Sequence, residues 1–60
     1  IGNGQLQMEN HRGILSYRED EVVVSGGKLL VRIQGSELEL QSMSANALLV
    51  AGVIRSVQLE

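Results

Sequence analysis

The sequence of 60 residues contains no cysteine, no phenylalanine and no tryptophan, and it has one tyrosine and one histidine. The absence of cysteine excludes disulfide bonds and thiolate metal sites, which often stabilise small domains. A single histidine, with no cluster of other ligands at metal-binding spacing, does not support a structural zinc site. With so few aromatic side chains, the core must consist of valine, leucine and isoleucine. We therefore predict a thin aliphatic core without a metal ion or cofactor.

The sequence also lacks a long apolar run and an excess of positive charge. No run approaches the length of about 20 residues that crosses a bilayer, and no signal peptide is visible. The net charge of −2 argues against a nucleic-acid-binding surface, which is usually basic. The lack of cysteine fits a reducing cytosol. Because the sequence begins at Ile1 rather than at methionine, we expect residues 1–60 to be one small all-β domain of a longer chain.

The small size of the chain makes its stability marginal. A folded chain of this size buries about 60% of the surface that it exposes when unfolded. For this chain the apolar part of the buried surface is roughly 3,400 Å². At about 25 cal/mol per Å², this burial stabilises the fold by about 85 kcal/mol. Ordering the chain costs about 90 kcal/mol, at roughly 1.5 kcal/mol per residue. Because the two terms cancel, we expect contacts with other subunits, as a homo-oligomer or with a partner protein, to stabilise the fold.

Alternation of apolar and polar residues with a period of two dominates the sequence, as in a sheet with one buried face. Leu38 and Leu40, for example, alternate with glutamate and glutamine. Short apolar runs at 22–24 and 48–50 are typical of strands that are covered on both faces. The pattern predicts six strands, at residues 4–9, 13–19, 21–25, 28–34, 37–42 and 47–59.

Small and polar residues separate the predicted strands. The segment Ser25-Gly26-Gly27 suits a tight hairpin, in which a glycine takes a positive φ. Gly13 suits the left-handed position at the end of the longer loop 9–13. Gly52, inside the last strand, indicates a bulge or a bend. Further turns are predicted at Gly35-Ser36 and at Ser44-Ala45-Asn46.

Two architectures accommodate short strands joined by tight turns. One is a small antiparallel sandwich or barrel of about six strands with a single core. The other is a short β-solenoid whose strands stack between subunits. A solenoid is built from repeats, and no internal repeat of matching residues is found in this sequence. We therefore favour the compact antiparallel form and keep the solenoid as the alternative.

No group of residues forms a convincing active site. His11 is the only imidazole, but adjacent residues of a turn point in different directions, and we expect Asn10 and His11 to satisfy the backbone of the turn. The three acids at 19–21 cannot alone supply the roughly six to eight oxygens that calcium needs. Gly26-Gly27 precedes a strand, whereas phosphate-binding loops precede helices. We predict no catalytic, cofactor-binding or metal-binding residues, no small-molecule substrate and no enzymatic activity.

Four apolar residues fall out of phase with the main apolar face of their strands. An apolar residue on the second face of a strand either supports a two-sided core or marks a contact surface. A two-sided core is difficult to build from so short a chain, so we predict that these residues belong to an interface between subunits. They are Tyr17, Leu30, Leu49 and Ile54.

The basic residues are scattered along the chain rather than clustered. They are Arg12, Arg18, Lys28, Arg32 and Arg55. No aromatic residues that could stack on bases lie beside them, so nucleic acid is not an expected partner. A nucleic-acid-binding barrel of the Sm-like or SH3-like kind has a similar number of strands, and it remains the alternative function.

Two segments of the sequence carry a resemblance to a known family. The first is the turn Glu9-Asn10-His11-Arg12-Gly13. The second is a series of glycine and apolar residues in the second half of the chain: Ile33, Gly35, Leu38, Leu40, Met43, Leu48, Val50, Gly52, Ile54 and Val57. Together they resemble the YabP/YqfC family of small sporulation proteins of endospore-forming bacteria, over residues 6–60.

The resemblance implies a small, non-enzymatic protein that is made in the mother cell during sporulation. Such proteins are encoded beside a membrane protein, which implies a membrane-protein partner. The role implied is structural: a scaffold or adaptor in spore envelope assembly, located in the mother-cell cytoplasm at the forespore outer membrane. The family has no catalytic residues that could be carried over to this chain.

Overall fold

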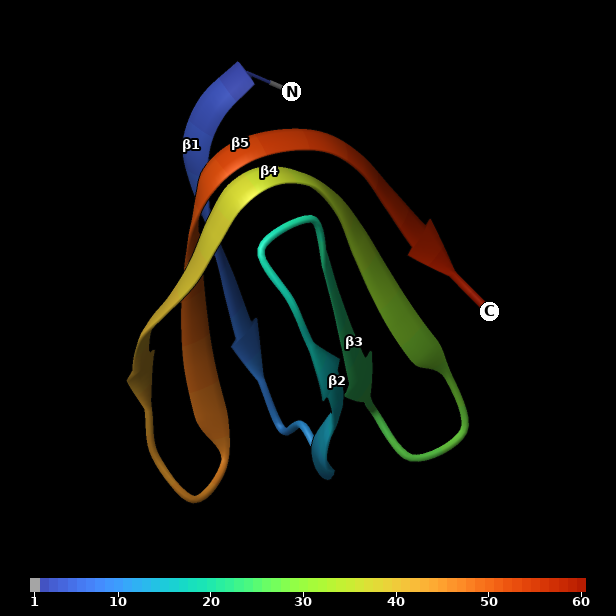
Figure 1. Cartoon of the computed structure of the whole chain (residues 1–60). Helices are drawn as coiled ribbons and strands as arrows, with labels where there is room; N and C mark the ends of the chain where they lie inside the picture. Colours follow the sequence, from blue (N-terminus) through green and yellow to red (C-terminus); the bar gives the residue numbers. More distant parts are fainter. Residues whose placement is uncertain (1) are drawn as a thin grey trace.

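The computed structural model describes residues 2–60 and, within them, shows five strands and no helix. The strands are β1 (Gly2–Glu9), β2 (Gly13–Tyr17), β3 (Glu21–Ser25), β4 (Leu30–Met43) and β5 (Ala47–Leu59). They form one sheet in the order β1-β5-β4-β3-β2, in which every pair of neighbours is antiparallel (Figure 1). The all-β antiparallel class predicted from the alternation is confirmed.

The two longest strands, β4 and β5, form a hairpin that bends in its middle (Figure 1). β1 pairs only with residues 47–54 of β5, and β3 pairs only with residues 30–34 of β4. The bend therefore divides the sheet into two arms. We call them the β1 arm, formed by β1 and the hairpin on its side of the bend (36–43 and 47–54), and the β3 arm, formed by β2, β3 and the remainder of the hairpin.

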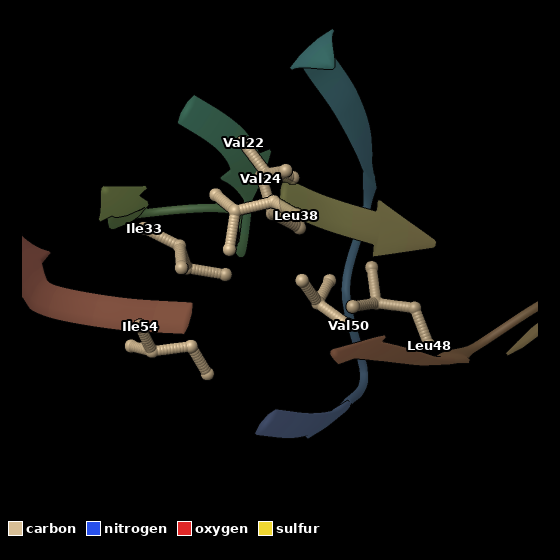
Figure 2. Packing of buried hydrophobic residues seen from close by; sticks show 7 residues of the cluster. All are labelled: Val22, Val24, Ile33, Leu38, Leu48, Val50 and Ile54. Carbon is tan, nitrogen blue, oxygen red and sulfur yellow. The ribbon is translucent and has the colours of Figure 1, made fainter. Parts of the chain in front are cut away.

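The core lies between the two arms. It is a cluster of aliphatic side chains, and Figure 2 shows that they converge from different strands. The β3 arm and the β1 arm both contribute: Val22, Val24 and Ile33 from the former, and Leu38, Leu48, Val50 and Ile54 from the latter. Partly buried side chains surround this cluster, among them Leu6 of β1 and Ile14 of β2. The predicted thin aliphatic core is thus confirmed.

Unusual backbone geometry forms the bend. Gly52 has a φ of 138° and Glu37 has a φ of 54°, both in the range that favours glycine. A Cβ atom at Gly52 would lie 2.5 Å from the carbonyl oxygen of Glu37. At Gly35 a Cβ would overlap the carbonyl oxygen of Val53. Glycine therefore lets β4 and β5 approach closely where they turn, and the bend predicted at Gly52 is confirmed.

The structure has five strands instead of six because the two predicted strands 28–34 and 37–42 form one continuous strand. The predicted turn at Gly35-Ser36 is wrong: β4 stays paired with β5 through this segment, with register shifts that mark bulges. In a sequence, a glycine can indicate either a bulge or a turn. Here the close approach of Gly35 to β5 favours the bulge.

The architecture is an open, folded sheet. The strand order runs from β1 at one edge to β2 at the other, and these two strands do not pair to close a barrel. Successive strands are antiparallel, which is not the parallel stacking of a solenoid, so the alternative architecture is wrong for this chain. The openness of the sheet matters because unpaired edges can bind a further strand.

Two turn predictions are confirmed and one is corrected. Gly27, in the loop between β3 and β4, has a φ of 90°, and the Ser44 N–H donates to the Ala47 carbonyl at 2.8 Å to close the β4–β5 turn. In the loop between β1 and β2, the left-handed residue is Asn10, with a φ of 62°, and not Gly13. Asparagine tolerates this conformation because its short polar side chain can bond locally.

We expect the substitution Glu37→Gly to stabilise the fold. Glu37 is exposed and pays a steric penalty for its positive φ, and removing its Cβ relieves about 1 kcal/mol. Thermal unfolding monitored by circular dichroism should show a melting temperature that is higher by about 4–8 °C. Glu39→Gly is the matched control, because Glu39 is exposed on the same strand and has no positive φ. We expect this substitution to destabilise the fold by about 0.5–1 kcal/mol. Equal effects of both substitutions would contradict the interpretation.

Candidate functional site

The turn that carries the family resemblance, residues 9–13, connects the β1 arm to the β3 arm. Backbone hydrogen bonds fix it at both ends. The Asn10 N–H donates to the carbonyl of Asn46, in the β4–β5 turn, and the Arg12 N–H donates to the carbonyl of Ser25 at 2.7 Å. The loop therefore ties together the ends of three different strands, β1, β3 and β5, which explains why a compact turn is needed here.

His11 is the one buried polar residue of the described chain, with 8% of its surface exposed. Its Nδ1 atom is buried and has no hydrogen-bond partner among the residues that the structure describes. The prediction that His11 satisfies the turn through its side chain therefore fails, because backbone groups from other strands hold the loop instead. The imidazole is therefore buried with one ring nitrogen unpaired.

The four residues predicted at an interface are not brought together. Tyr17 is 51% exposed, and its hydroxyl accepts a hydrogen bond from the Leu40 N–H at 2.8 Å. Leu30 and Leu49 are half-buried on different arms. Ile54 is only 6% exposed and belongs to the core (Figure 2), because Gly52 turns the chain inward just before it. Only three of the four side chains are thus accessible to another subunit.

Other large apolar side chains are also exposed. Leu59 is 67% exposed, and the further exposed large apolar residues are Leu15, Leu29, Met43 and Val57. Val57 and Leu59 were not predicted as surface residues. Their exposure depends on the order of the strands in the sheet, because the end of β5 lies at the edge of the β3 arm. The alternation of apolar and polar residues does not indicate strand order.

The acidic segment 19–21 forms the corner between β2 and β3. The Arg18 N–H donates to the Glu21 carbonyl across it at 2.8 Å. A shallow polar hollow lies beside this corner, lined by acids and by the two arginines Arg18 and Arg55. Within residues 2–60, no three carboxylate or imidazole groups are placed to hold a metal ion.

An ion-pair network lies on the outer surface of the β3 arm. The Arg32 guanidinium donates to Glu21 and to Glu60, with N–O distances of 3.0 Å in both ion pairs. Gln34 donates to the same Glu21 carboxylate at 3.3 Å. The hydrogen bond from Arg32, followed by that from Gln34, lowers the pKa of Glu21 below its usual 4.5, and the two carboxylates raise the pKa of Arg32.

We expect this network to make stability depend on pH in the acid range. Because the pKa of Glu21 is lower in the folded chain than in the unfolded chain, its contribution is present above pH 4.5 and is lost as the pH falls through the folded value. The effect is small and decreases with added salt, because the pair is partly exposed. Urea unfolding from pH 6 to pH 2.5 should show a smaller acid loss for Glu21→Gln than for the wild type. Glu39→Gln is the control, and an equal change in both variants would contradict the assignment.

The part of the chain that the structure describes contains no helix with the length and apolarity needed to span a bilayer. A comparison with curated proteins gives no match. A comparison with protein families matches the whole of residues 1–60, which include both the turn at 9–13 and the glycine and apolar series that follows it. The resemblance inferred from these two segments is confirmed: the chain belongs to the YabP family, and this membership suggests a role related to sporulation.

Proposed function

We propose that this chain is a non-enzymatic structural protein of endospore formation, which acts by association of its sheet with copies of itself or with a membrane-protein partner. The observation that carries the proposal is the open sheet of a YabP family member. Unpaired N–H and C=O groups along a sheet edge template a further strand. In this proposal the protein works in the mother-cell cytoplasm at the forespore outer membrane, in assembly of the spore envelope.

The size of the core supports association. Seven aliphatic side chains form the buried cluster, and no disulfide or aromatic anchor adds to it. Small domains with so little burial are usually stabilised by oligomerisation when crosslinks are lacking. At the same time, large apolar side chains such as Leu59 remain on the surface, where another subunit could bury them.

The surroundings of His11 argue against an enzymatic role. A general base must reach a proton of its substrate directly or through one water molecule. The imidazole is more than nine-tenths buried, and within the described residues its Nδ1 contacts neither a nucleophile nor an orienting carboxylate.

The basic side chains give little support to the alternative of a nucleic-acid-binding barrel. Nucleic acid is bound by cations that are free to contact phosphates. Arg32 donates to two carboxylates of its own chain, and Arg18 and Arg55 share their hollow with Asp20 and Glu21. The sheet is also not closed into a barrel.

Size-exclusion chromatography with light scattering tests the proposal. At high micromolar concentration we expect a mass well above the 6.5 kDa of one chain. A fluorescent fusion of the full-length protein in sporulating cells should accumulate on the mother-cell side of the forespore boundary. A stable monomer together with diffuse fluorescence in the mother cell would overturn the proposal.

A further inference from the structure

The outer edge of β4 changes its partner where the hairpin bends. Over residues 30–34 this edge pairs with β3, but the pairing does not continue past the bend. The corner between β2 and β3 lies there instead (Figure 1), and two of its backbone carbonyls accept hydrogen bonds from β4. Gly35 donates to Asp20 at 3.0 Å, and Leu38 donates to Glu19 at 2.8 Å. The corner therefore continues the edge pairing across the bend, from the β3 arm to the β1 arm.

Tyr17, the last residue of β2, extends this contact along β4. It is in register with Val22, whose side chain is buried in the core, so the tyrosine ring lies on the core face of the sheet. From there the hydroxyl reaches the β1 arm and accepts a hydrogen bond from the Leu40 N–H at 2.8 Å. Tyr17, predicted to contact another subunit, thus binds the opposite arm of its own chain.

We call the three acceptors of this contact the clasp: the hydroxyl of Tyr17 and the backbone carbonyls of Glu19 and Asp20. The remainder of the fold has its own connections. The β4–β5 pairing continues through the bend, and the loop 9–13 is held by separate backbone hydrogen bonds. Release of the clasp can therefore move the corner away from β4 while the hairpin and the loop stay in place.

The surroundings of the clasp favour local opening. Residues 17–20 are all exposed, so little apolar burial holds them against β4. The carboxylates of Glu19, Asp20 and Glu37 line one shallow hollow with the single guanidinium of Arg18, so that negative charges of the corner and of β4 face each other. Segments with exposed hydrogen bonds and little apolar burial open at a lower free energy than the fold as a whole.

The clasp covers both a pairing edge and a part of the core. Leu38 is only 4% exposed and belongs to the buried cluster, and its N–H is one of the groups that the clasp binds. When the clasp opens, the N–H groups of Leu38 and Leu40 become available, and free N–H groups at a sheet edge accept a further strand. The state of the clasp therefore determines whether this edge can pair.

We propose that the clasp is a gate on the β4 edge at residues 35–40, which opens by local movement of the β2–β3 corner while the rest of the sheet stays folded. Tyr17 controls this gate, because its hydroxyl is the one side-chain group of the clasp and the other two acceptors are backbone carbonyls. The inference goes beyond the proposed function, since it concerns a movement within one chain and holds whether or not copies of the chain associate.

Cysteine labelling tests the gate, because residues 1–60 contain no cysteine and one introduced thiol is an unambiguous reporter. Leu38→Cys places the thiol directly behind the clasp. Leu48→Cys is the matched control, because Leu48 is 1% exposed in the same cluster but lies at the other end of the β1 arm, beside the β4–β5 turn.

The rate of labelling by a water-soluble aromatic disulfide is measured for each cysteine with Tyr17 in place and with Tyr17→Phe, which removes only the hydroxyl. The full-length protein is used, with any cysteine outside residues 1–60 changed to serine. Circular dichroism checks that every variant keeps its sheet. Light scattering at the same concentration reports the mass, so that opening and association are measured separately.

We expect Tyr17→Phe to speed the labelling of Leu38→Cys about fivefold, the factor that corresponds to the loss of one hydrogen bond of about 1 kcal/mol. The labelling of Leu48→Cys should change by less than about twofold. As an independent readout, the Leu40 amide should exchange with solvent at least about fivefold faster in Tyr17→Phe, whereas the amides between β1 and β5 keep their rates.

An equal acceleration at both cysteines would overturn the inference, because the hydroxyl would then stabilise the whole fold rather than hold the corner. Unchanged rates at both cysteines would overturn it as well. A monomer that shows the expected difference between the two cysteines would contradict the proposed self-association and leave the gate intact.

Discussion

Replacing Gly35 by alanine is expected to destabilise the fold by at least about 3 kcal/mol. The added Cβ would overlap the carbonyl oxygen of Val53 and lie 2.9 Å from the carbonyl carbon of the same residue. Both atoms belong to the backbone of β5, so neither can move without breaking the β4–β5 pairing. For a domain of this size, such a loss is a large part of a total stability of about 3–9 kcal/mol.

Urea unfolding of Gly35→Ala, monitored by circular dichroism, measures this loss. Gly13→Ala is the matched control, because a Cβ at Gly13 would meet no atom within 4 Å. We expect the control to change the stability by no more than about 0.5 kcal/mol. A Gly35→Ala variant as stable as the control would show that the bend does not depend on the close approach of the two strands.

The substitution Ile33→Ala is expected to cost about 3–4 kcal/mol. Ile33 is fully buried in the cluster between the arms, and it joins β3 and β5 through its position in β4 (Figure 2). Truncation removes apolar burial and leaves a cavity that a two-armed sheet can only partly close.

Leu15→Ala is the control for this core substitution, because Leu15 is 61% exposed and its truncation should cost less than about 0.5 kcal/mol. Both variants are compared with the wild type at one protein concentration, since association adds to the apparent stability. Similar losses for Ile33→Ala and Leu15→Ala would mean that the space between the arms is not the core of the fold.

The strands were predictable because alternation reports which face of a strand is buried, whatever its neighbours are. The continuity of β4 across the predicted strands 28–34 and 37–42 was not predictable, because Gly35 gives the same local signal for a turn as for a bulge. The distinction depends on Val53, which lies far along the sequence and fills the space beside Gly35. Contacts of that kind are absent from any local pattern.

The candidate site was only partly predictable, because it also depends on contacts between residues that are far apart in the sequence. The turn at 9–13 was recognised from its residues, but the burial of His11 depends on strands that the loop brings together. Ile54 was out of phase with its strand because Gly52 changes the direction of the chain before it, and not because it faces another subunit. The exposure of Val57 and Leu59 was not predicted, because it follows from the strand order.

The dependence of the melting temperature on protein concentration tests most directly whether association between chains stabilises this small fold. If folding and association are linked, each tenfold rise in concentration adds about 1.4 kcal/mol to the apparent stability. We therefore expect the melting temperature of the wild type to rise by about 5 °C for each tenfold increase. A melting temperature that stays constant from micromolar to millimolar concentration would contradict the account.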